Sequence, residues 1–117
     1  TLSVLEAVVA DKAKGEVTVE GVRLEGLAIP AHMSNGDTVR LALRPESVRR
    51  NGRDGDQQFE AKVTVVDFLG SVIRIRLQLG ETRISLDSFN DPTRPPPSVG
   101  ETMQVYFDPQ SVLALAS

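Results

Sequence analysis

The chain has 117 residues, of which 40% are hydrophobic, and it contains no cysteine and a single histidine. This length fits one domain with its own core, and the apolar content is too high for a disordered chain. The absence of cysteine excludes thiol nucleophiles, disulfides and Cys-ligated zinc, and a lone histidine excludes two-histidine metal sites. The 13 basic and 16 acidic residues give a net charge of −3, which disfavours binding to nucleic acid through its phosphates.

The termini and the apolar runs bear on the cellular context. No run approaches the roughly 18 to 20 apolar residues that a membrane span needs, and the first residues lack the pattern of a signal peptide. We therefore expect a soluble polypeptide without direct membrane insertion. Because the chain does not begin with Met, it can be a piece of a longer protein.

Apolar and polar residues alternate along most of the chain, which predicts half-buried β-strands. The expected strands cover 17–19, 22–24, 38–44, 63–65, 73–79, 84–86 and 103–107, with less regular apolar ends at 2–10 and 112–115. Longer loops are expected at 51–58 and 91–98. No segment of 11 or more residues has a helical stripe, so any helix is a turn or two, at 45–49 or 85–90. The pattern predicts an all-β sandwich or barrel.

The two halves of the chain resemble each other. Residues 36–48 share Gly, Thr, Pro, Ser and Val with residues 100–112 at a spacing of 64 residues, and five further pairs are conservative. A fainter echo relates 21–24 to 80–86. Internal duplication explains this pattern, and chance resemblance of two turn-strand units is the alternative. We expect a single domain, 1–117, with halves of roughly 1–58 and 59–117 that pack or exchange strands into an oligonucleotide/oligosaccharide-binding (OB)-like barrel or sandwich.

Motifs for catalysis and metal binding are missing. The chain has no Gly-x-x-x-x-Gly-Lys-[Ser/Thr] loop for nucleotide phosphates. Gly70-Ser71 lacks the Gly-x-Ser-x-Gly pattern, and His32 is the sole histidine to serve as a base. The acidic pair Asp54 and Asp56 lacks the spacing of an EF-hand. We therefore identify no catalytic residue and no metal site, and we expect that the chain is not an enzyme.

Arginines occupy polar positions of the predicted strands. The ladder comprises Arg40, Arg44, Arg74, Arg76 and Arg83. Such a stripe can bind an oxyanion through charge-assisted hydrogen bonds, with Arg40, Arg74 and Arg76 as the candidates. The alternative is a solvated outer face whose arginines pair with Asp and Glu on neighbouring strands. The absence of Trp and the single Tyr argue against a platform that stacks bases or sugars.

Three segments together resemble a known family. They are Arg44-Pro45-Glu46 after an apolar strand, Val66-Asp67-Phe68-Leu69-Gly70-Ser71 further along, and Phe107-Asp108-Pro109 near the end. The set is similar to the TOBE (transport-associated OB) domain at the C-terminus of the ATP-binding subunits of bacterial ABC importers for maltose, polyamines, ferric iron or phosphonate. The resemblance spans nearly the whole chain. It implies a regulatory and dimerising extension behind an ATPase domain that this chain lacks.

The resemblance also implies partners and a location. The partners are the chain's own ATPase domain, a second copy in a homodimer and the membrane permease subunits, with no nucleic acid. ATP and Mg bind in the absent ATPase domain, so no cofactor is expected here, and the location is cytoplasmic, at the inner face of the membrane through the parent transporter. The motif residues are Arg44, Pro45, Glu46, Phe68, Leu69, Gly70 and Ser71, of which Phe68 and Leu69 are expected to cover an apolar contact.

Two other functions remain open. The first is a small module that binds an oxyanion or solute between protomers, as in molybdate-binding proteins, which the duplicated halves and the arginine ladder would suit. The second is a nucleic-acid-binding OB domain, which the net charge and the few aromatic residues disfavour.

Overall fold

Two five-stranded antiparallel sheets make up the fold, in a computed structural model that describes residues 2–115. The elements in chain order are β1 (Ser3–Asp11), the 3-10 turn η1 (Lys12–Lys14), β2 (Glu16–Val19), β3 (Val22–Leu24), β4 (Thr38–Leu43), η2 (Pro45–Ser47), β5 (Val48–Arg49), β6 (Gln57–Leu69), β7 (Val72–Leu79), β8 (Thr82–Phe89), β9 (Thr102–Phe107), η3 (Pro109–Ser111) and β10 (Leu113–Leu115). The prediction of an all-β, OB-like fold is confirmed. Within the described residues, no helix is long and apolar enough to cross a membrane.

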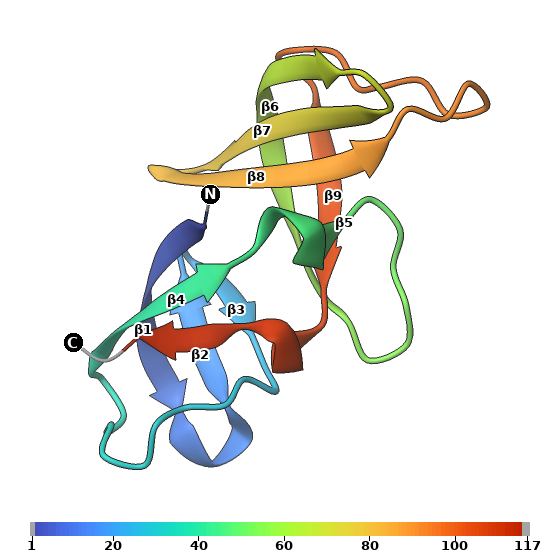
Figure 1. Ribbon diagram of the computed structural model, residues 1–117. Helices are drawn as coiled ribbons and strands as arrows, with labels where there is room; N and C mark the ends of the chain where they lie inside the picture. The colour runs from blue at the N-terminus through green and yellow to red at the C-terminus, as the bar shows by residue number, and fades with distance from the viewer. Residues whose placement is uncertain (1, 116–117) are drawn as a thin grey trace.

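Each sheet takes one edge strand from the other half of the chain (Figure 1). The strand order is β10-β4-β1-β2-β3 in the first sheet and β5-β9-β6-β7-β8 in the second. The late strand β10 therefore pairs with β4, and the early strand β5 pairs with β9. The two halves are intertwined by this reciprocal exchange.

Proline residues end the strands that precede both crossings. Pro45 follows β4 and Pro109 follows β9, and each opens a 3-10 turn in which its missing N–H costs no ladder hydrogen bond. Both prolines are buried. The chain leaves its own sheet at these turns and enters the other one.

One helical expectation is wrong. The segment 85–90 was expected to allow a short helix, but residues up to Phe89 belong to β8, in register with β7. The reason is the period of two, since Ile84 and Leu86 are buried while the residues between and after them are partly exposed. The other expected turn, at 45–49, is the 3-10 turn η2 followed by β5.

A single hydrophobic core joins the two sheets. Its buried cluster includes Leu5 and Leu41 of the first sheet and Phe59, Ile75 and Phe107 of the second. The rings of Phe59 and Phe107 lie with their centroids 6.0 Å apart.

The start of β1 packs across β8 at the junction of the sheets. Ser3 is buried there, and its Oγ accepts a hydrogen bond from the backbone N–H of Ser85 at 3.0 Å. This contact ties the first strand of one sheet to the edge strand of the other.

Candidate functional site

The first family motif forms the corner between β4 and η2. Pro45 is buried, whereas Arg44 and Glu46 are exposed on either side of it. The N–H of Ser47 donates to the carbonyl of Arg44 at 2.9 Å and closes the turn. Within residues 2–115 neither Arg44 nor Glu46 forms an ion pair. The corner packs against β8.

The second motif forms the tip of the hairpin between β6 and β7. Gly70 has φ +85°, which an L side chain rarely adopts and which the tight turn requires. Phe68 is 62% exposed and Leu69 is 55% exposed, at the end of β6. Phe89, 80% exposed, lies at the same end of the sheet, two strands away from Leu69, because Val72 of the intervening strand β7 pairs with both. We call Phe68, Leu69 and Phe89 the apolar tip.

Phe89 was not among the residues singled out from the sequence. It follows the predicted strand 84–86 by three positions, and no local pattern places it next to residue 69. Only the register of three neighbouring strands brings the two side chains to the same end of the sheet. The structure leaves the side chains of Phe68 and Leu69 exposed, and their place at an apolar contact stays a prediction.

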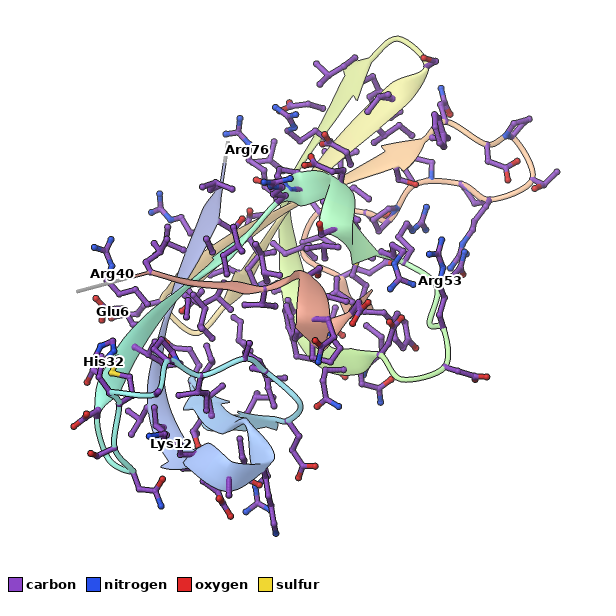
Figure 2. The ribbon with its side chains drawn as sticks, turned by 60° about the horizontal axis from the view of Figure 1, so that its bottom comes forward. Glu6, Lys12, His32, Arg40, Arg53 and Arg76 are labelled. Carbon is purple, nitrogen blue, oxygen red and sulfur yellow. The ribbon has the colours of Figure 1, made fainter. Side chains whose placement is uncertain are left out.

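The arginine ladder does not form one site. Arg74 and Arg76 lie on β7 of the second sheet, whereas Arg40 lies on β4 of the first, where its register partner is Glu6. Figure 2 shows Arg40 beside Glu6 and well apart from Arg76.

Aspartates neutralise the two arginines of β7. Arg74 donates to both carboxylate oxygens of Asp87, from Nε at 2.8 Å and from Nη2 at 3.0 Å. This bidentate hydrogen bonding lowers the pKa of Asp87 and raises the pKa of Arg74. Arg76 lies 3.9 Å from Asp67, from Nη2 to Oδ2, in a looser and more exposed pair. Cross-strand pairing thus accounts for most of the charge at these positions.

A groove of about 610 Å³ lies at the junction of the sheets. Polar side chains that line it include Ser3, Thr64, Arg74, Arg76, Arg83 and Ser85. Arg83 on β8 is exposed and forms no ion pair within residues 2–115. The groove therefore offers one free guanidinium, one loosely paired guanidinium and several hydroxyl groups, a set that suits a small anion.

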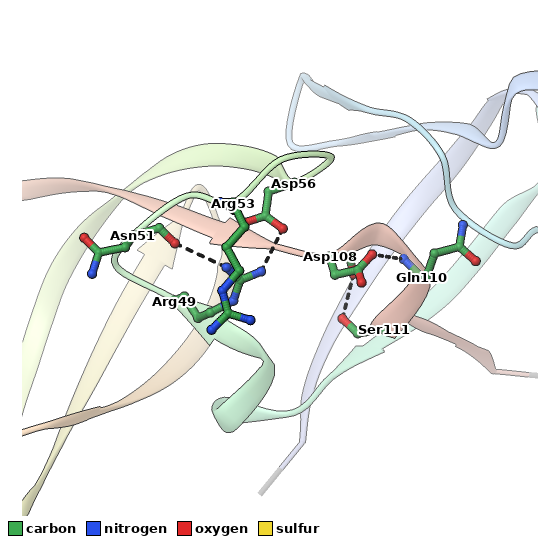
Figure 3. Close-up of polar contacts among 7 residues, drawn as sticks. All are labelled: Arg49, Asn51, Arg53, Asp56, Asp108, Gln110 and Ser111. Carbon is green, nitrogen blue, oxygen red and sulfur yellow. Dashed lines mark hydrogen bonds and ion pairs between the residues drawn. The ribbon is translucent and has the colours of Figure 1, made fainter.

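Two hydrogen bonds to Asp56 hold the acidic loop after β5 (Figure 3). Asp56 accepts a hydrogen bond from Nη2 of Arg49 at 2.7 Å and another from the backbone N–H of Arg53 at 2.8 Å. These bonds lower the pKa of Asp56, with the Arg49 hydrogen bond as the largest cause. Within residues 2–115 no three metal-ligating side chains gather. Figure 3 also shows the 3-10 turn η3, where the side chain of Asp108 accepts a hydrogen bond from the backbone N–H of Gln110 at 2.9 Å.

The fold and the motifs agree with known proteins. The structure resembles a crystal structure of the cytoplasmic molybdate-binding protein ModG with molybdate bound, at a TM-score of 0.69, with 13% identity over 95% of this chain and 93% of that chain. No curated protein matches the sequence. The family model of the TOBE domain matches residues 41–115, which include both motifs and more than half of the chain. The chain therefore belongs to the TOBE domain family.

Proposed function

We propose that this chain is a non-catalytic regulatory and dimerisation domain of the ATP-binding subunit of an ABC solute importer. Membership of the TOBE family supports a binding or regulatory module. The observation that carries the proposal is the apolar tip, three large side chains exposed together at one end of the second sheet. Clustered exposed apolar residues mark contact surfaces more often than isolated ones do.

A second copy of the chain is the proposed occupant of the apolar tip. In a two-fold contact the same residues of both copies meet, so one tip would cover the other. Full burial of a Phe or Leu side chain contributes about 1.5–3 kcal/mol. Because association itself costs about 4–15 kcal/mol, three such residues from each copy would give at most a weak dimer. The tight Gly70 turn holds the end of the hairpin in one shape before the contact forms.

The rest of the proposal concerns the parent protein. Its ATPase domain would bind ATP and Mg, and the permease subunits would bring this domain to the inner face of the cell membrane. The domain itself would then act through the distance and orientation of the two ATPase domains, without a cofactor of its own. The buried corner at Pro45 and the junction contact of Ser3 would give the domain the stiffness that such a role requires.

Sedimentation velocity over a range of protein concentration tests the dimer. The wild-type chain is expected to dimerise at high micromolar concentration, and Phe68→Ala to remain monomeric. Leu113→Ala on β10 of the other sheet removes a side chain that is also about half exposed and serves as the control. A wild-type monomer at high micromolar concentration, together with an unchanged full transporter carrying Phe68→Ala, would end the proposal.

The second candidate function is the binding of a small oxyanion at the junction groove. The specific observation in its favour is the set of Arg76, Arg83 and hydroxyl groups in that groove. The structural neighbour ModG binds molybdate, which supports the same ligand class here. Calorimetry with molybdate and sulfate is the test. Binding that Arg83→Gln weakens and that Arg23→Gln on the first sheet leaves unchanged would favour this function over the first.

A further inference from the structure

A second groove, of about 390 Å³, lies between two loops of the second sheet. One loop, residues 50–56, follows β5, and the other, residues 90–98, follows β8. Arg49 at the end of β5, Arg50 and Arg53 from the first loop, and Arg94 from the second loop all line the groove. The four arginines are separated by up to 45 positions in the sequence, and none belongs to the ladder of the strands.

Arginine side chains hold the two loops against each other. Arg94 donates from Nη1 to the side-chain oxygen of Asn51 and from Nη2 to the carbonyl of Arg50, the latter at 3.5 Å. In return Arg50 donates from Nη2 to the carbonyl of Pro95 at 3.2 Å. The guanidinium groups are therefore positioned before any ligand binds, which reduces the entropy that a ligand would have to overcome.

Three of these four arginines form no salt bridge within residues 2–115, whereas Arg49 pairs with Asp56 at 2.7 Å. Carboxylates act on the three from a greater distance, Glu101 on Arg50, Asp56 on Arg53 and Asp91 on Arg94. Within residues 2–115, no carboxylate oxygen lies within 4.0 Å of the guanidinium groups of Arg50, Arg53 and Arg94.

The acidic residues that line the groove are mostly engaged elsewhere. Asp87 is bonded to Arg74, and Asp91 accepts hydrogen bonds from the backbone N–H and the hydroxyl of Thr93. The third, Glu46, forms no ion pair within the described part of the chain. The groove therefore keeps an excess of hydrogen-bond donors with positive charge.

One donor group of Arg50 lacks a hydrogen-bond partner within the described residues. Its Nε is buried and has no hydrogen-bond partner within residues 2–115. Burial and the neighbouring charge of Arg94 lower the pKa of Arg50, and the charge of Glu101 opposes this shift in part. Two guanidinium groups held side by side repel each other, and an anion between them would remove this repulsion.

We propose that the groove between loops 50–56 and 90–98 binds a doubly charged tetrahedral oxyanion through Arg50, Arg53 and Arg94. Guanidinium forks match the oxygen spacing of phosphate and sulfate and bind them with paired hydrogen bonds. The exposed ring of Phe89 lines the same groove. It gives an apolar surface to an organic group that carries the phosphate. The ligand is thus a phosphate or sulfate dianion, free or as a phosphoryl ester. This proposal does not depend on dimerisation or on the junction groove.

Titration with inorganic phosphate at low ionic strength tests the site by NMR and calorimetry. The Nε–Hε signal of Arg50 is expected to shift and saturate, because that group gains its missing partner. Arg53→Gln should weaken binding about tenfold, equivalent to about 1.4 kcal/mol. The side chain of Arg53 is exposed and forms no hydrogen bond within the described residues, so its loss leaves the loops intact. Arg23→Gln removes the same charge from the first sheet and should change the affinity less than twofold.

Two further comparisons identify the class of ligand and the groove that binds it. Because Phe89 also belongs to the apolar tip, the next comparison is made at protein concentrations at which the chain is monomeric. Phenyl phosphate should then bind more tightly than inorganic phosphate if the natural ligand is an ester, and Phe89→Ala should abolish that gain. Equal affinity of the two compounds assigns the site to free oxyanions. The proposal is overturned if the Arg50 signal shows no saturable shift, or if Arg53→Gln and Arg23→Gln weaken binding equally. It is also overturned if the shifts are centred on Ser3 and Ser85, because the anion would then lie in the junction groove. Sedimentation of the same Arg53→Gln sample shows whether dimerisation is intact, so the two proposals fail separately.

Discussion

Replacement of Phe107 by alanine tests whether the intertwined sheets share one core. Phe107 is 1% exposed and lies at the end of β9, where its register partners are Val48 of β5 and Gln57 of β6. Its ring packs against Phe59, and it belongs to the same buried cluster as Leu5 of the first sheet. Loss of this ring therefore removes packing within the second sheet and packing in the core that the second sheet shares with the first.

The magnitude follows from the burial of the ring. A buried Phe→Ala substitution costs about 3–5 kcal/mol, because the lost transfer free energy and the cavity add. A domain of this size is stable by about 5–15 kcal/mol, so the variant loses a large share of its stability. With a urea slope of about 2 kcal/mol per M, a loss of about 4 kcal/mol lowers the unfolding midpoint by about 2 M.

Urea unfolding followed by circular dichroism is the assay. The variant is expected to unfold in a single transition at the lower midpoint, since one core joins both sheets. Phe89→Ala makes the same chemical change at an 80% exposed position, and at low protein concentration it should alter stability by less than about 0.5 kcal/mol. A loss below about 1 kcal/mol for Phe107→Ala, or two separate transitions, would refute the reasoning.

Three further predictions concern single contacts. Ser3→Ala leaves the partly buried N–H of Ser85 without its acceptor and should cost about 0.5–1.5 kcal/mol in urea unfolding, whereas Ser3→Thr, which keeps the hydroxyl, should cost less. Because Arg74 lowers the folded-state pKa of Asp87, that carboxylate stabilises the fold above its unfolded pKa of about 3.9 and loses this effect as the pH falls. The stability difference between wild type and Asp87→Asn should therefore be largest near neutral pH and shrink below about pH 4; an unchanged difference at low pH would contradict it. Gly15→Ala should lower the melting temperature sharply, because Gly15 has φ +63° and an added Cβ would lie 2.3 Å from a backbone oxygen.

Much of the fold could be predicted from local patterns. The alternation over 73–79 identifies β7, which spans Val72–Leu79, and Pro45 marks the end of β4. Strand patterns are readable because each strand has one buried face, which imposes a period of two on its residues. The apolar end at 2–10 was considered less regular, yet Ser3, Leu5, Ala7 and Val9 alternate strictly into the core. The regularity is hidden in the sequence because the exposed positions Leu2, Val4 and Val8 are apolar as well.

The candidate sites were harder to predict. Arg40, Arg74 and Arg76 share a polar strand pattern, but the pattern does not say which sheet each strand joins, and the structure separates Arg40 from the other two. Arg50 and Arg94 lie 44 positions apart in loops without periodicity, so nothing local indicates that the side chain of Arg94 reaches the backbone of Arg50. Phe89 joins Leu69 only through the register of β7 with its two neighbours.

The sequence by itself determined most strands, the prolines that end β4 and β9 and the resemblance to the TOBE family, because these depend on residue types at fixed spacings. The tertiary structure alone decided that β10 completes the first sheet and β5 the second. It also decided which charges are paired and which apolar and basic side chains gather at one end of the second sheet. Such long-range partners are selected by the packing of whole sheets against a common core, where many weak contacts add up, and no short segment of the chain contains that information.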